Sequence, residues 1–134
     1  MTKTEAVIRS ILGAARADIR PLVHAVDITI DLLFTQGIPM DDIHVTDDIY
    51  PAAARLVKNR FGRPASPGAV SRRIERLANL CWDTLVERGL VLEYMGAPLG
   101  DIRAPRDMIF YLAFYICFDA PFFTVIQQRP ALLF

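Results

Sequence analysis

The feature that most constrains this chain is a long stretch with apolar side chains at helical spacing between two strong boundary signals. It begins at Ser66-Pro67, because serine is a favoured N-cap and proline is favoured at the first helical position. It ends at Gly89, the residue type favoured just beyond a helix C-terminus. One face of this helix carries the apolar residues Val70, Ile74, Leu77, Cys81 and Leu85. The stretch therefore predicts an amphipathic helix that buries this face.

Other segments repeat the helical pattern, and the evidence for strands is slight. Helices are predicted from Thr4 to about Ala17, from Ile19 to Gln36 with Pro21 in the first turn, from an N-cap at Thr46 to Phe61, and from Arg106 to Phe118 after Pro105. Leu90–Met95 reads as a short extended piece and Gly96–Arg103 as a loop. A length of 134 residues fits one domain. We therefore expect a single all-α domain over residues 1–134.

The C-terminal part, residues 105–134, is the most apolar in the chain. A membrane-spanning helix needs roughly 20 apolar residues, and Asp119 and Pro121 interrupt the run Met108–Phe118 too early. We therefore expect a buried core helix and no membrane association. The apolar tail that continues to Phe134 predicts packing on the domain or part of a homodimer interface.

Charge is balanced overall but segregated along the sequence. The chain has 15 basic and 15 acidic residues. Seven of the basic residues and only one acid, Glu75, fall between Arg55 and Arg76, which gives this stretch a net charge of +6. The rest of the chain carries −6, with eight basic and fourteen acidic residues. A local basic surface of this size is typical of proteins that neutralise DNA phosphates.

Two helices joined by a turn rich in Gly and Pro, the second carrying arginines near its start, match the outline of a helix-turn-helix at about residues 46–89. The predicted recognition helix spans about residues 67–88. The candidates for base contacts are Ser71, Arg72, Arg73, Glu75 and Arg76. The candidates for phosphate contacts are Arg55, Lys58, Arg60 and Arg63.

The run VTDDIYPAAARLVKNRF followed by AVSRRIERLANLCW resembles the C-terminal DNA-binding effector domain of the sporulation master response regulator of endospore-forming bacteria. The shared features are Tyr50-Pro51 inside a helix, Phe61 at its end, and Val70, Arg72, Ile74 and Trp82 at matching spacing. Weaker similarity covers residues 12–33 and 105–116. The resemblance implies a bundle of about six helices that binds double-stranded promoter DNA and regulates transcription through the helix beginning near Pro67.

The chain also departs from that family's pattern. Of the residues with which the family reads bases, only Arg72 is kept. Other positions carry Ala69 for an arginine, Ser71 for a glutamate, Glu75 for an arginine and Arg76 for a histidine, and the turn before the helix is two residues longer. These differences predict a different DNA target or weaker sequence reading. There is no room for the family's receiver domain, so we expect a stand-alone relative, which the Met1 start favours, or an excised domain.

The alternative function is a protein-interaction module that keeps the fold, has lost specific DNA reading, and dimerises or pairs with a regulator through the apolar tail. An enzyme is not expected, since no phosphate loop, nucleophile elbow or HExxH pattern occurs. His24 and His44 lack further ligands at short spacing, so we expect no metal, cofactor or small-molecule substrate. Cys81 and Cys117 predict free core thiols, and the absence of a signal-peptide pattern predicts a cytoplasmic protein.

Overall fold

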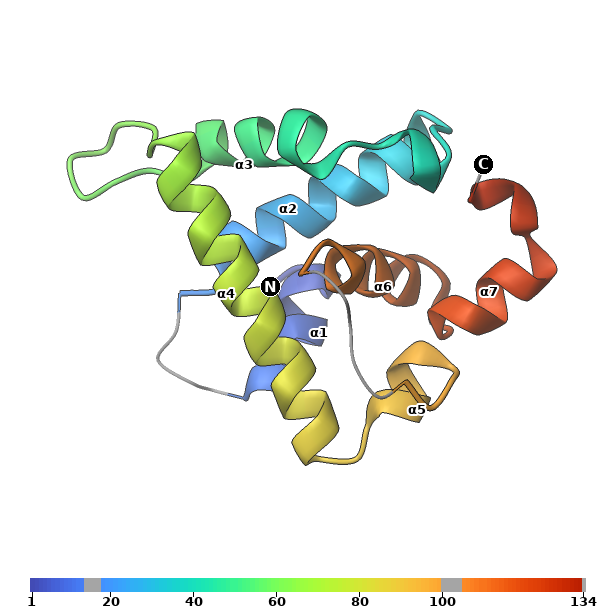
Figure 1. Cartoon of the computed structure of the whole chain (residues 1–134). Helices are drawn as coiled ribbons and strands as arrows, with labels where there is room; N and C mark the ends of the chain where they lie inside the picture. Colours follow the sequence, from blue (N-terminus) through green and yellow to red (C-terminus); the bar gives the residue numbers. More distant parts are fainter. Residues whose placement is uncertain (14–17, 100–104, 134) are drawn as a thin grey trace.

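The computed structural model describes residues 1–13, 18–99 and 105–133, and in these ranges the regular elements are helices (Figure 1). The α-helices are α1 Lys3–Leu12, α2 Arg20–Ile30, α3 Tyr50–Leu56, α4 Pro67–Glu87, α5 Val91–Met95, α6 Pro105–Phe118 and α7 Phe122–Gln128. Turns of π-helix span Asp31–Thr35 and Val45–Ile49, and 3-10 turns span Met40–Asp42 and Pro130–Leu132. The all-α prediction is confirmed.

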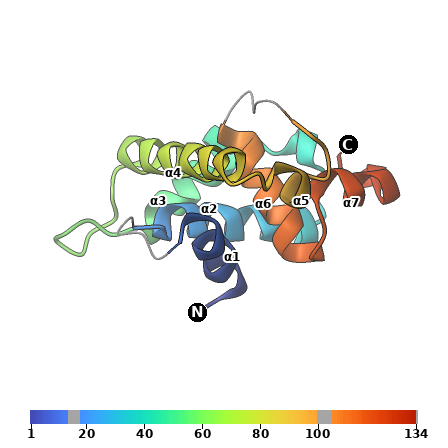
Figure 2. The same ribbon diagram turned by 90° about the horizontal axis from the view of Figure 1, so that it is seen from below.

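The core of the bundle lies where α2, α4 and α6 meet. Helix α6 packs against both α2 and α4, while α3 covers the other side of α2 near the start of α4 (Figures 1 and 2). Helix α1 is tied to the far end of α4 by Arg88, whose guanidinium donates at 3.1 Å to the carbonyls of Ser10 and Ile11. Helix α4 is therefore held along its length, and its orientation is fixed by contacts with four other helices.

The boundary signals of the long helix are confirmed. The Ser66 hydroxyl accepts a hydrogen bond from the Ala69 N–H at 3.3 Å, so serine is the N-cap. At the other end, the Leu90 N–H donates to the Leu85 carbonyl and the Gly89 N–H to the Val86 carbonyl. This is a Schellman motif, in which Gly89 adopts a φ of +68° that favours glycine.

Two predicted elements are wrong. The helix predicted from Thr46 to Phe61 is capped at His44, whose N–H donates to the Asp48 carboxylate at 2.8 Å, and it ends at Leu56. Residues 57–65 form a hairpin loop instead, stabilised by hydrogen bonds that the helical pattern does not reveal. Leu90–Met95 is not extended, since α5 occupies it. The predicted end of the first helix, 14–17, and residues 100–103 of the predicted loop lie outside the described residues.

The apolar C-terminal tail packs back on the domain, as one of its two predicted arrangements requires. Phe122 and Val125 of α7 are buried, and the ring of Phe114 in α6 lies 4.9 Å from that of Phe122 and 5.3 Å from that of Phe34, between centroids. Within the described ranges, no single helix is long and apolar enough to cross a membrane, and α6 and α7 reach that composition together only as a pair bent by 69°.

Both cysteines are free, as predicted, but only one lies in the core. Cys81 is fully buried in α4, and this burial raises the pKa of its thiol to about 12. Cys117 is exposed, because it falls on the outer face of α6, so the prediction of a core position was wrong for this residue.

Candidate nucleic-acid interface

The outward face of the first half of α4 carries two arginines. Arg72 and Arg76 are four residues apart, so they lie one above the other on the same face. Both are exposed, whereas Val70, Ile74 and Leu77 on the opposite face are buried. Towards the second half of the helix the outward face turns acidic, with exposed Asp83 and Glu87. Positive charge is thus concentrated at the end of α4 that a recognition helix presents to DNA bases.

Two other base-contact candidates face the neighbouring helix or the local backbone. Glu75 lies close enough to the Tyr50 hydroxyl, across the contact between α3 and α4, to affect its ionisation. Burial of Tyr50, together with the charge of Glu75, raises the pKa of that hydroxyl to about 12. The Ser71 hydroxyl donates to the Gly68 carbonyl at 3.0 Å. Glu75 therefore lies at the contact between α3 and α4.

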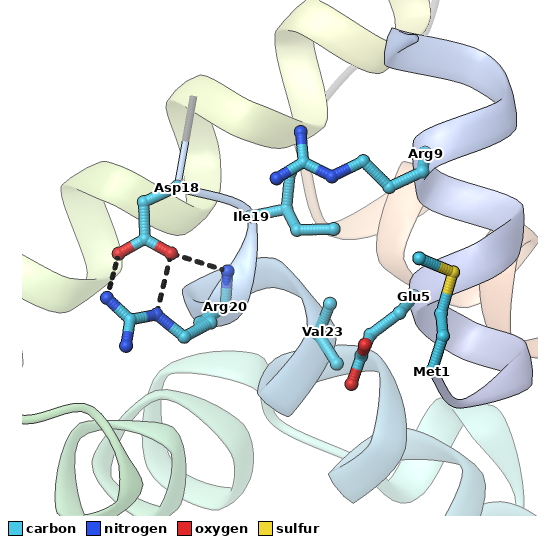
Figure 3. A pocket seen from close by; sticks show the side chains of 7 residues that line it. All are labelled: Met1, Glu5, Arg9, Asp18, Ile19, Arg20 and Val23. Atoms are coloured by element: carbon cyan, nitrogen blue, oxygen red, sulfur yellow. Dashed lines mark hydrogen bonds and ion pairs between the residues drawn. The ribbon is translucent and has the colours of Figure 1, made fainter. Parts of the chain in front are cut away.

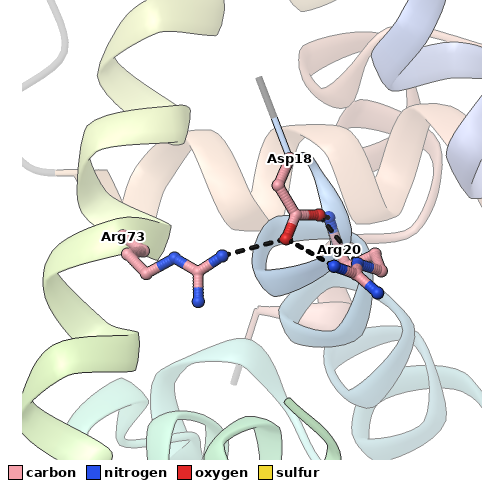
Figure 4. Close-up of polar contacts among 3 residues, drawn as sticks. All are labelled: Asp18, Arg20 and Arg73. Carbon is pink, nitrogen blue, oxygen red and sulfur yellow. Dashed lines mark hydrogen bonds and ion pairs between the residues drawn. The ribbon is translucent and has the colours of Figure 1, made fainter. Parts of the chain in front are cut away.

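Arg73 is held by Asp18, the residue two positions before α2 begins (Figure 4). One oxygen of the Asp18 carboxylate accepts from the Arg73 guanidinium at 3.0 Å. The same carboxylate accepts two hydrogen bonds from the Arg20 side chain, at 2.8 and 2.9 Å. These hydrogen bonds from Arg20, with the nearby charge of Arg73, lower the pKa of Asp18 to about 2. Arg73 is thus a positioning residue that joins the starts of α2 and α4.

Replacing Asp18 by asparagine is expected to remove a pH-dependent part of the stability. The folded pKa of about 2 lies below the ordinary value of 3.8. The contribution of the charged carboxylate is therefore present above about pH 4 and is lost as the pH falls towards 2. Because the Asp18 side chain is 35% exposed, we expect only about 1 kcal/mol at neutral pH. Urea unfolding of both proteins as a function of pH measures the difference. A difference that persists unchanged at about pH 2 would contradict this assignment.

The residues predicted to contact phosphate gather around the hairpin between α3 and α4. Lys58, Arg60 and Arg63 are exposed on the hairpin, and Arg55 is exposed at the end of α3. The hairpin, residues 57–65, has an antiparallel bridge between Lys58 and Pro64. It projects from the same end of the bundle as the start of α4 (Figures 1 and 2). The structure therefore places the hairpin with its three cations, and the end of α3 with Arg55, at the end of the bundle where α4 begins (Figure 1).

Sequence reasoning missed Arg20. Its side chain is 77% exposed and, with Leu56, Val57 and Lys58, lines a hollow of about 220 Å³ beside the hairpin. A cation in the first turn of a helix is unfavourable to the helix dipole. Arg20 in the first turn of a predicted helix, two residues after Asp18, was therefore a signal in the sequence that this arginine pairs with a nearby carboxylate.

A second hollow of about 380 Å³ lies between α1 and the start of α2 (Figure 3). Ile19 and Val23 provide the apolar lining of this hollow. Asp18 and Arg20, joined by hydrogen bonds, lie at one edge of it. In the part of the chain that the structure describes, no group of three or more His, Cys, Asp or Glu is placed to hold a metal ion. The basic surface around α4 is therefore the stronger candidate site.

Comparison with protein-family models, with curated proteins and with solved structures finds no match for this chain. The likeness to the sporulation regulator's effector domain stays a prediction from the residues. The connection between α3 and α4 covers residues 57–66, whereas a helix-turn-helix uses a turn of about 3–4 residues. The connection between these two helices is thus longer than that of a helix-turn-helix, and the likeness to that motif is limited to the order of the two helices.

Proposed function

We propose that this protein binds double-stranded promoter DNA sequence-specifically and regulates transcription, in the manner of the sporulation-regulator effector domain that its sequence resembles. The observation that carries the proposal is the outward face of the first half of α4, where Arg72 and Arg76 are exposed one turn apart, while Glu75 beside them is half-buried. An α-helix fits the major groove, and arginine is the commonest side chain that pairs with the guanine edge there. In this proposal α4 enters the major groove by its first half.

The surrounding cations have a different role. Arg55, Lys58, Arg60 and Arg63 lie before the start of α4 and contact phosphates, which position the helix without reading sequence. Arg73 holds α4 in place through Asp18, and Glu75 lies at the contact with α3. Specificity then depends on few side chains, chiefly Arg72 and Arg76. We therefore expect a short recognised sequence in which guanines dominate.

Selection of binding sites from random duplexes, followed by affinity measurements over a range of salt concentrations, tests the proposal. Four phosphate contacts predict that the logarithm of the association constant falls with the logarithm of salt concentration with a slope of about −3.6. Enrichment of a common sequence with such a slope is the expected result. A salt slope without enrichment would leave only non-specific binding. The absence of both enrichment and a salt slope would refute the proposal.

The alternative, a protein-interaction module, is favoured by one observation at the other end of the molecule. A hollow of about 270 Å³ beside α6 and α7 is lined mostly by apolar and aromatic side chains: Met40, Asp107, Phe110, Tyr111, Phe122, Phe123, Ile126 and Leu133. Such a surface suits an apolar side chain from a second copy or from a regulator. Sedimentation over a concentration series tests the homodimer, and a monomer at every concentration would exclude that form of the alternative.

A further inference from the structure

The hairpin 57–65 has a defined shape. The Asn59 N–H donates to the Arg63 carbonyl at 2.7 Å, and the Ala65 N–H donates to the Val57 carbonyl at 2.8 Å. The Asn59 side-chain oxygen accepts from the N–H groups of Phe61 and Arg63, at 2.8 and 3.2 Å. Gly62 adopts a φ of +76°, in the left-handed region that closes such a turn without a steric cost. These bonds fix the direction in which the tip points before any ligand is bound.

The tip of the hairpin presents an apolar side chain to solvent. Phe61 is 72% exposed, so its ring has little contact with the core. The Arg60 guanidinium lies over it, 4.9 Å from the ring centroid. A single exposed aromatic residue is common on protein surfaces. Here, however, it stands on an ordered turn between cations, and the hairpin contains Lys58, Arg60 and Arg63 but no acidic residue.

The position of the hairpin relative to α4 fits the two grooves of DNA. It leads directly into α4 at Ser66 and projects past the start of that helix (Figures 1 and 2). Phe61 lies three residues beyond the bridge at Lys58, and three residues of extended chain span about 10 Å. From a helix seated in the major groove, which is about 12 Å wide, a projection of this length reaches the phosphates that separate it from the adjacent minor groove. The cations of the hairpin complement the charge of both.

We infer that the hairpin enters the minor groove next to the major groove occupied by α4, and that Phe61 inserts there as a wedge between two base pairs. Apolar wedges of this kind unstack a base step and kink the duplex towards the major groove. Lys58 and Arg63 contact the phosphates on either side, and the Arg60 guanidinium, which lies over the ring of Phe61 in the structure, leaves the ring face as the ring enters the base step. This inference rests on the proposed function and adds to it that the protein bends its DNA target.

Fluorescence energy transfer between dyes at the two ends of a selected duplex of about 30 base pairs measures the bend. The protein as it exists is expected to shorten the end-to-end distance by an amount that corresponds to a kink of about 20–90°. Phe61→Ala is expected to abolish most of that change and to lower affinity about tenfold, through the lost contact with a base. Phe61→Leu keeps an apolar wedge and retains most of the bend.

Leu92→Ala is the matched control, because Leu92 is also a large exposed apolar side chain, 62% exposed, but lies on α5 at a distance from the hairpin. It should leave both bend and affinity unchanged. Binding without a bend, or a bend that Phe61→Ala does not reduce, would overturn the inference and leave the proposed function intact. Failure of the unaltered protein to bind any duplex with a salt-dependent affinity would refute the proposed function, and the inference with it.

Discussion

Replacing Arg72 and Arg76 together by alanine is expected to lower the affinity for a selected duplex at least about thirtyfold. Each bidentate contact between arginine and guanine is worth about 1–3 kcal/mol of discrimination against the wrong base, and both side chains lie on the outward face of α4. The protein itself should remain folded, because both residues are exposed and the buried stripe of α4 is untouched. Fluorescence anisotropy on the selected duplex and on a scrambled duplex measures the effect.

The comparison between the two duplexes distinguishes base reading from phosphate contact. The double variant should lose most of its preference for the selected duplex, with a smaller loss on the scrambled one. Arg63→Ala is the control, since Arg63 lies on the hairpin, away from the outward face of α4. It should weaken binding equally on both duplexes and reduce the magnitude of the salt slope by about one. Equal loss on both duplexes in the double variant would show that Arg72 and Arg76 contact phosphates.

The helices were predictable where local residues determine them. Ser66, Pro67 and Gly89 act through their own side chains and φ angles, so their effect can be read without knowing the fold. The end of α3 at Leu56 was not predictable in this way. The residues that follow include no strong helix breaker before Gly62, and the chain leaves the helix because Asn59 bonds within the hairpin. The helical pattern alone does not weigh such competing side-chain bonds.

The candidate site was predictable in composition but not in orientation. The charge of the stretch from Arg55 to Arg76 indicated a basic surface, and six of its seven basic residues are exposed. Which arginines face outward depends on partners distant in sequence. Arg73 turns towards Asp18, which is 55 residues away, and Glu75 turns towards Tyr50. These pairings arise from the packing of α2, α3 and α4, which no local pattern specifies.

The largest effect on stability is expected from Phe114→Ala. Phe114 is fully buried in α6, and its ring contacts those of Phe34, Phe118 and Phe122. It therefore joins the core helix to the π-helical turn that follows α2 and to the C-terminal tail. Removing a buried phenylalanine ring costs about 3–5 kcal/mol, because apolar burial is lost and a cavity is left. That is a large share of the roughly 5–15 kcal/mol that stabilises a typical domain.

Phe61→Ala makes the same chemical change at the tip of the hairpin, where the side chain is 72% exposed. A surface substitution of this kind changes the free energy of unfolding by less than about 0.5 kcal/mol. Urea unfolding followed by circular dichroism compares the two variants with the unaltered protein. A loss below about 1 kcal/mol for Phe114→Ala would contradict the packing of the tail on α6. A large loss for Phe61→Ala would show that this ring supports the fold, and its effect on DNA bending could then no longer be assigned to a wedge.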